Sequence, residues 1–138
     1  MKRVLIAEDD FFIRDIYSKV FAVSGYTVEL AVDGQDALDK IKASPQPYDM
    51  LLLDIMMPKV TGLDVLRQLR AMPSPFKDTS VFILSNLGQQ SIIEEAFKIG
   101  MDGYIIKSQM TPQQIVDEIN TYFENKVTAS TSQPNTQK

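Results

Sequence analysis

The sequence predicts a doubly wound α/β domain, in which a five-stranded parallel sheet lies between two layers of helices. Five short apolar runs alternate along the chain with five longer stretches whose apolar residues recur every three or four positions. The short runs are apolar throughout rather than at every second residue, which is typical of parallel strands buried on both faces. This alternation predicts strand–helix–strand units and a three-layer α/β/α architecture.

The expected strands are mostly rich in Val, Ile or Leu, and they cover Val4–Ala7, Thr27–Ala31, Met50–Leu53, Val81–Leu84 and Tyr104–Ile106. The expected helices follow them in turn over Phe11–Val23, Asp33–Ala43, Leu63–Ala71, Gln89–Ile99 and Thr111–Phe123. Gly25 and Gly100 follow the first and fourth helices as stop signals. Thr111 and Pro112 open the fifth helix as an N-cap and a proline at the first helical position.

The chain has 138 residues, which fits one domain. Its last segment, VTASTSQPNTQK, has no periodicity and carries a single charge, at Lys138. A segment of this composition does not bury enough apolar surface to fold. We therefore expect one domain over residues 1–125, followed by a disordered polar tail over residues 126–138.

The composition argues against several kinds of protein. With 18 acidic and 14 basic residues the chain is mildly anionic, which argues against nucleic acid or an anionic membrane as its partner. It has no cysteine and no histidine, so disulfides, thiolate metal sites and Ser-His-Asp catalysis are unavailable. The N-terminal apolar run is too short for a signal peptide, and no segment approaches the roughly 20 apolar residues of a membrane span. We expect a cytoplasmic protein, which the absence of cysteine suits.

Polar residues stand where four of the five expected strands end. They are Glu8, Asp9 and Asp10 after the first strand, Asp54 after the third, Ser85 and Asn86 after the fourth, and Lys107 and Ser108 after the fifth. Parallel strands direct their C-terminal ends to one edge of the sheet, where ligands bind in this class of fold. Taken singly, the acids could be helix caps or turn formers, the serine a loop hydroxyl and the lysine a solvated amine. Their coincidence favours a common site.

These residue types fit phosphoryl chemistry. Three crowded carboxylates repel one another, so a bound cation would stabilise them, and oxygen ligands without His or Cys select Mg²⁺ over Zn²⁺. A magnesium ion beside a lysine and a hydroxyl stabilises the charge of a phosphoryl group in transfer. One carboxylate is then available as the nucleophile, since carboxylates accept phosphoryl groups as acyl phosphates.

The segments VLIAEDD, LLLDIMMPKVTG, FILSN and GYIIKS have the order and spacing of a known family. Over Lys2–Glu124 the chain resembles the receiver domain of two-component response regulators, of the stand-alone, chemotaxis-regulator-like kind. The resemblance implies a flavodoxin-like (βα)5 fold, with Asp54 as the phosphoacceptor. The implied ligands of Mg²⁺, for which Mn²⁺ can substitute, are Glu8, Asp9, Asp54 and the backbone carbonyl of Met56.

The same resemblance implies the other roles at the site. Ser85 and Lys107 would bind oxygens of the phosphoryl group. Tyr104 would occupy the aromatic switch position, whose ring turns inward as the hydroxyl of Ser85 moves. The signal is expected on the face formed by Gln89–Lys98, Tyr104–Ile106 and Pro112–Tyr122.

The expected protein is a signalling domain rather than an enzyme, since it catalyses only its own phosphorylation and dephosphorylation. Because the chain has no histidine, the phosphoryl donor must be another molecule, namely a histidine kinase, a phosphotransfer protein or a small phosphodonor. No output domain fits in the chain, so we expect an unknown downstream protein as the target. The expected oligomeric state is a monomer or a weak phosphorylation-dependent dimer.

Three features depart from the family pattern. Ser108 follows Lys107 where the family usually has a proline in a cis peptide, and Asn86 stands where a small residue is common. Met56 and Leu87, which flank the path of the attacking water in this family, are both apolar. Neither side chain orients a water molecule, so we expect slow self-dephosphorylation.

Two alternatives stay open. Ser108 and Asn86 are compatible with a docking module that no longer takes phosphate. A Mg²⁺-dependent phosphatase with an aspartyl nucleophile would use a similar sheet, but it generally needs a second acid where Met56 stands, as well as a cap domain.

Overall fold

The computed structural model describes residues 2–86 and 89–131. Its five strands are β1 (Arg3–Ala7), β2 (Thr27–Ala31), β3 (Met50–Asp54), β4 (Ser80–Ser85) and β5 (Gly103–Ile106). They form one parallel sheet in the order β2-β1-β3-β4-β5. The predicted five-stranded parallel sheet is confirmed, and each strand lies within one residue of its expected limits.

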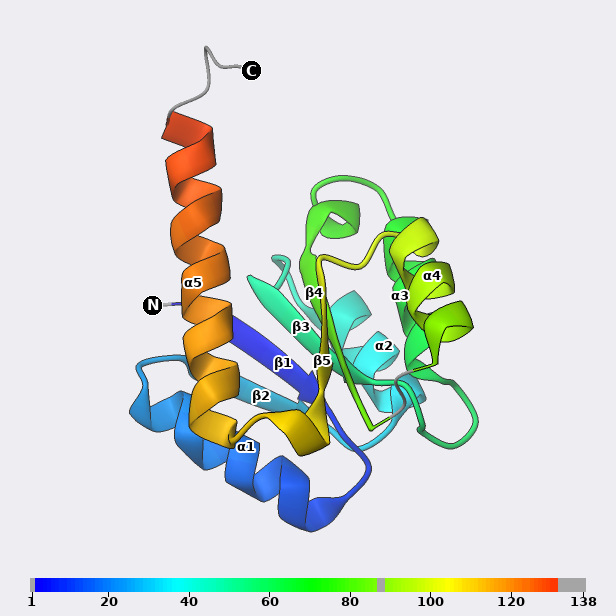
Figure 1. The fold of residues 1–138 in the computed structure, drawn as a ribbon. Coiled ribbons are helices and arrows are strands. Elements are labelled where there is room, and N and C mark those ends of the chain that lie inside the picture. Colours follow the sequence, from blue (N-terminus) through cyan, green and yellow to red (C-terminus); the bar gives the residue numbers. More distant parts are fainter. Residues whose placement is uncertain (1, 87–88, 132–138) are drawn as a thin grey trace.

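The helices are α1 (Phe11–Val23), α2 (Gly34–Ala43), α3 (Gly62–Arg70), α4 (Gln90–Ile99) and α5 (Pro112–Thr131), with 3₁₀ turns η1 (Phe76–Asp78) and η2 (Lys107–Gln109). Helices α1 and α5 lie on one face of the sheet, and α2, α3 and α4 lie on the other (Figure 1). The predicted doubly wound, three-layer α/β/α architecture is therefore confirmed. The chain leaves β1 for β2 on one side and then returns to β3 on the other, so the strand order reverses between β1 and β3. In such sheets, ligands bind outside the C-terminal ends of the strands at this point.

Side chains near the helix ends explain where several helices begin. The carboxylate of Asp10 accepts hydrogen bonds from the backbone N–H groups of Phe12 and Ile13, at 2.9 and 3.1 Å, and so caps α1. Thr61 and Asp64 exchange hydrogen bonds in a capping box at the start of α3. The prediction that Asp10 caps a helix is thus correct. Asp10 therefore has a structural role that differs from the role expected for Glu8 and Asp9.

The core has two halves, one on each face of the sheet. Along β3, Leu51 and Leu53 pack towards α2, α3 and α4, whereas Met50 and Leu52 pack towards α1 and α5. All four side chains are fully buried. Burial of one such side chain stabilises the fold by about 1.5–3 kcal/mol, so β3 is a rigid support for the residue at its end.

Helix α5 is longer than expected. It continues to Thr131, although the sequence predicts a helix ending near Phe123 and a disordered tail from residue 126. No glycine or proline lies between these positions, so the backbone can propagate the helix past its last apolar turn. Residues 132–138 lie outside the described part of the chain, and the disorder of that segment stays a prediction. Within the described residues, no helix has the length and apolar character needed to cross a membrane.

Candidate functional site

Three carboxylates meet at the C-terminal edge of the sheet, beside the point where the strand order reverses. Glu8 follows β1, Asp9 comes next, and Asp54 ends the neighbouring strand β3. Each offers an oxygen, and these oxygens all lie within 4.8 Å of one another. Glu8 and Asp54 are buried, whereas Asp9 is exposed. The arrangement is an acidic site that is closed towards the core and open to solvent on one side.

Lys107 reaches this acidic site from the far side of the sheet, beyond the end of β5. Its Nζ atom lies 2.5 Å from Oε1 of Glu8 and 3.3 Å from Oδ2 of Asp54. Its side chain is only 9% exposed, so these ion pairs are shielded from bulk water. One ammonium group thus contacts two of three carboxylates, and the four groups together carry a net negative charge. A further cation would therefore be stabilised here.

Burial and ion pairing shift the pKa values of the three buried groups at this site. Burial raises the pKa of Glu8 above its ordinary value, although the hydrogen bond from Lys107 opposes the rise. Burial likewise raises the pKa of Asp54, again against the influence of Lys107. Burial lowers the pKa of Lys107, but the two carboxylates outweigh it and the net shift is upward. The lysine therefore keeps its proton, while both acids are less stable as anions than in water.

Backbone contacts hold the two buried carboxylates in place. The backbone N–H of Asp10 donates to Oε2 of Glu8 at 3.1 Å, and the guanidinium of Arg14 donates to the Glu8 carbonyl at 2.7 Å. The backbone N–H of Met56 donates to Oδ1 of Asp54 at 3.3 Å. The Met56 side chain is 62% exposed and does not fill the site. The Met56 backbone therefore helps to hold Asp54 in place, and the Met56 side chain lies largely in solvent.

The loop after Asp54 is fixed by two close backbone approaches at glycines. A Cβ atom on Gly62 would lie 2.3 Å from the carbonyl oxygen of Asp54, and one on Gly34 would lie 2.0 Å from that of Val60. Neither distance is sterically possible for a larger residue. The backbone N–H of Gly62 also donates to the carbonyl of Ile55 at 3.2 Å. The contacts of Gly62 thus join the end of this loop to the end of β3, and Val60, near the same end of the loop, lies against α2.

Ser85 and Tyr104 lie on the neighbouring strands β4 and β5. Ser85 is fully buried at the end of β4, and Tyr104 is half-buried. Burial raises the pKa of Tyr104, a hydrogen bond with Ser85 lowers it, and the charge of Asp54 raises it further. The Tyr104 hydroxyl is therefore linked to Ser85 and lies on the side of the acidic site.

The three departures from the family pattern have different outcomes. Among the described residues the cis peptide bond is Ser74–Pro75, so the Lys107–Ser108 bond is trans. Asn86 is exposed at the rim of the site. Leu87 lies outside the described residues, so its position relative to Met56 stays a prediction.

Three residues beside the site were not predicted from the sequence. Arg14 supports the carbonyl of Glu8, and its spacing of one helical turn from Asp10 was an available signal. Gly34 contacts Val60 across a gap in sequence that no local pattern reveals. Tyr17 is buried next to Lys107 and carried only the signal of an apolar helix position.

Known proteins share this fold and these motifs. The family model for the response regulator receiver domain matches residues 4–120. The chemotaxis protein CheY of Treponema pallidum is 33% identical over 106 residues, which make up 76% of this chain and 72% of that protein. The response regulator MprA of Mycobacterium avium is 40% identical over 105 residues, again 76% of this chain but only 44% of that regulator. The chain thus spans less than half the length of MprA.

A solved structure agrees with the sequence relatives. The CheX–CheY–BeF3–Mg²⁺ complex from Borrelia burgdorferi contains a chain that superimposes with a TM-score of 0.80 and 25% identity, over 88% of this chain and 89% of that one. Receiver domains are the phosphoacceptor signalling domains of two-component systems and are not enzymes in the usual sense. The family match over most of the chain, together with the flavodoxin-like fold, shows that this chain belongs to the response regulator receiver domain family and is CheY-like.

Proposed function

We propose that Asp54 accepts a phosphoryl group from a histidine kinase or a phosphotransfer protein, in a reaction that requires Mg²⁺. The observation that carries this proposal is the convergence of three carboxylates and one ammonium group, with Lys107 Nζ 3.3 Å from Asp54 Oδ2. A phosphoryl group is anionic, so a lone carboxylate would repel it. Positive charge placed around the nucleophile removes that repulsion.

The acidic site has the ligands that Mg²⁺ prefers. Glu8, Asp9 and Asp54 supply oxygens within 4.8 Å of one another, a spacing that one cation can bridge, and we infer that the Met56 carbonyl completes the protein ligands. The exposed side of the site leaves room for water ligands, which Mg²⁺ usually retains. When bound, the ion would offset the negative charge of the carboxylates and of the phosphoryl group. Mn²⁺ has similar ligand preferences and can take its place.

The residues around Asp54 then have distinct tasks in the transfer. A carboxylate oxygen of Asp54 attacks phosphorus, an O–P bond forms, and the N–P bond of the donor phosphohistidine breaks. The imidazole leaves with the electron pair of that bond and takes a proton from solvent. Lys107 balances the charge of one phosphoryl oxygen, and the hydroxyl of Ser85 donates to another. Hydrolysis of the resulting acyl phosphate by water regenerates the carboxylate.

The link between Ser85 and Tyr104 supports a route from the site to the surface. If Ser85 turns to a phosphoryl oxygen, the hydrogen bond with Tyr104 changes, and β5 connects this change to α4 and α5. Phe97 on α4 is 71% exposed and would supply an apolar contact to a partner that binds the α4–β5–α5 face. We propose that this face binds a downstream protein in the cytoplasm, with the chain as a monomer or weak phosphorylation-dependent dimer. Neither nucleic acid nor a membrane is the proposed target.

Incubation with acetyl phosphate and Mg²⁺, followed by intact-mass measurement, tests the acceptor. We expect the mass of one phosphoryl group to be added. Asp54→Asn should abolish the gain, whereas Asp39→Asn, which changes a carboxylate on the exposed side of α2, should keep it. No gain with any donor would favour a docking module that works without phosphate.

Recovery of partner proteins with and without beryllofluoride and Mg²⁺ tests the signalling face. We expect more partner in the presence of both reagents, and less when Phe97 is replaced by serine. Equal recovery in all samples would argue against a phosphorylation-dependent surface.

A further inference from the structure

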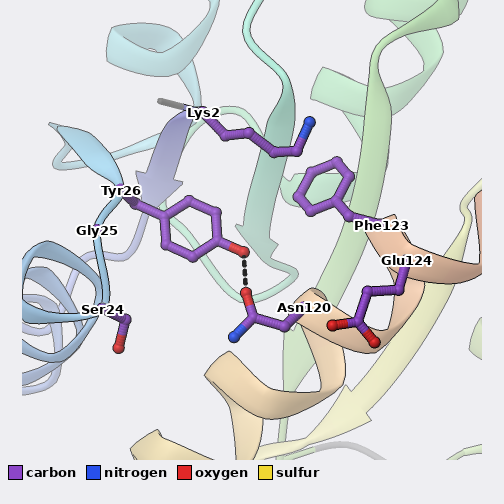
Figure 2. Close-up of a pocket in the computed structure, with 7 residues that line it drawn as sticks. All are labelled: Lys2, Ser24, Gly25, Tyr26, Asn120, Phe123 and Glu124. Atoms are coloured by element: carbon purple, nitrogen blue, oxygen red, sulfur yellow. Dashed lines mark hydrogen bonds between the residues drawn. The ribbon is translucent and has the colours of Figure 1, made fainter. Parts of the chain in front are cut away.

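Two cavities lie near opposite ends of α1, and each contains a tyrosine. The first has a volume of about 270 Å³ and lies at the N-terminal edge of the sheet, where Figure 2 shows its lining residues. The hydroxyl of Tyr26 donates to Oδ1 of Asn120 at 2.5 Å, and the ammonium of Lys2 lies 4.5 Å from the ring centre of Phe123. The hydroxyl of Tyr26 and the amide of Asn120 thus satisfy each other, and the Lys2 ammonium rests on an aromatic ring. The first cavity therefore has a structural explanation.

The second cavity lies beside the acidic site, between α1 and the connection from β5 to α5. Its volume is about 320 Å³. Ile13, Met110 and Pro112 form much of its apolar wall, while Lys107 and Asn86 contribute polar groups. Because Lys107 also contacts Glu8 and Asp54, the second cavity shares a wall with the acidic site.

Tyr17 lines this second cavity and differs from Tyr26 in one respect. Tyr17 is only 5% exposed, yet its hydroxyl forms no hydrogen bond with any of the residues that the structure describes. A buried hydroxyl without a partner is unfavourable, and native proteins rarely leave one unsatisfied. Burial raises the pKa of Tyr17, and the charges of Lys107, Glu8 and Asp54 also act on it. The hydroxyl is therefore protonated at neutral pH, and it is available as a donor next to the acidic site.

We propose that the second cavity binds a compact, uncharged ligand with an apolar body and a carbonyl oxygen that accepts a hydrogen bond from Tyr17. The apolar body would pack against Ile13, Met110 and Pro112. Charged ligands are disfavoured, because Lys107 is the charged residue among those that line the cavity and its ammonium already pairs with Glu8 and Asp54. Small aromatic amides have the required shape and chemistry.

Titration of the full chain with benzamide, followed by the amide signals in ¹H–¹⁵N NMR spectra, tests this proposal. We expect saturable shifts that are largest around Tyr17 and Asn86. Tyr17→Phe should weaken binding about tenfold, which corresponds to the loss of one hydrogen bond. Tyr26→Phe is the matched control, since it removes a hydroxyl from the other cavity, and it should leave the benzamide affinity unchanged.

Two further probes test the ligand chemistry in the unaltered protein. Toluene keeps the apolar body and lacks the acceptor, so it should bind about tenfold more weakly than benzamide. Benzoate adds a negative charge and should also bind more weakly. Equal affinity for benzamide and toluene, or shifts that do not saturate, would overturn the proposal. Because binding is measured without phosphorylation, this result is independent of whether Asp54 accepts a phosphoryl group.

Discussion

Glu8 and Glu29 are both paired with a cation, but their environments have opposite effects on their ionisation. Glu29 on β2 accepts a hydrogen bond from the hydroxyl of Tyr48 at 2.7 Å and pairs with Arg3 at 3.2 Å. The Tyr48 hydrogen bond is the main cause of a lowered pKa at Glu29, while burial, together with the same contact, raises the pKa of Tyr48 to about 12. At Glu8 burial dominates and raises the pKa, in spite of Lys107. One carboxylate is stabilised as an anion by its surroundings, and the other is not.

Arg70 and Lys107 lie at opposite edges of the sheet, and they differ in the partners that they bind. Arg70, at the N-terminal edge, donates to the carbonyl oxygens of Gly100, Lys77 and Thr79 at distances of 2.6–3.0 Å, and to Asp102 at 3.1 Å. These contacts join α3 to η1, β4 and the start of β5. The ammonium of Lys107, at the C-terminal edge, contacts the side-chain carboxylates of Glu8 and Asp54. The arginine completes the fold, whereas the lysine partly relieves a repulsion that the fold creates.

This contrast teaches how structural and functional charges differ in one small domain. A polar group whose partners satisfy it stabilises the folded chain, and its removal costs stability. A cluster with excess buried charge costs stability, and it is retained where a ligand or a reaction uses that charge. The following substitutions should therefore separate stability from phosphoryl transfer.

Loss of the Lys107 ammonium should have the largest effect. Lys107→Met should slow phosphorylation of Asp54 by acetyl phosphate on the order of 100- to 1000-fold, because charge on a phosphoryl oxygen would no longer be balanced. Lys19→Met is the control, since Lys19 lies on α1 with its side chain 75% exposed, and it should leave the rate unchanged. The measurement is the rate of mass gain at saturating Mg²⁺. A wild-type rate in the Lys107 variant would remove this residue from the mechanism.

Loss of the Arg70 guanidinium should lower the stability of the fold and leave phosphorylation unchanged. Arg70→Met leaves the partly buried carbonyl groups of Gly100 and Thr79 without this donor and should lower the free energy of unfolding by about 2–4 kcal/mol. Phosphorylation per folded molecule should not change. Arg67→Met, on the same helix, removes exposed ion pairs to Asp64 and Glu95 and should cost about 0–1 kcal/mol. Urea unfolding followed by circular dichroism measures both, and equal losses in the two variants would contradict a structural role specific to Arg70.

The raised pKa of Asp54 predicts how pH affects stability in the absence of Mg²⁺. The folded state holds the Asp54 proton more tightly than the unfolded state, whose pKa is near 3.8, so this contribution to stability is present below that pH and is lost as pH rises. Asp54→Asn should therefore stabilise the protein at pH 7, with the gain vanishing in acid. Glu29→Gln should behave oppositely, because its pKa is lowered and it contributes only above its unfolded pKa. The free energy of unfolding of both variants, measured between pH 3 and pH 7, tests this prediction. If the two variants show the same dependence on pH, Asp54 and Glu29 do not differ in the way proposed.

The sequence predicted the strands and the acids of the site, but it did not predict the contacts that decide how those acids ionise. The strands follow from the apolar runs of the sequence. The convergence of the acids at one site follows from the rule that parallel strands end at one edge of the sheet. The contacts that decide ionisation join distant residues, such as Glu8 with Lys107 and Glu29 with Tyr48. The length of α5 was missed because residues beyond Phe123 have weak apolar periodicity, although nothing in them stops a helix. Burial and long-range pairing are properties of the packed chain, and a local pattern does not contain them.

The smallest predicted effect concerns how long a phosphoryl group stays on Asp54. Met56 is 62% exposed beside Asp54, the proposed acceptor, and its thioether does not orient water as an amide or a carboxylate would. Met56→Asn should therefore speed the loss of phosphate about fivefold, roughly the value of one added hydrogen bond to the attacking water. Val23→Asn changes an equally apolar side chain, 89% exposed at the far end of α1, and should not alter the decay. Decay is followed by intact mass after removal of the donor. If the Met56 variant and the wild-type protein lose phosphate at the same rate, the lifetime is set by the buried charges around Asp54 rather than by the apolar residue at its entrance.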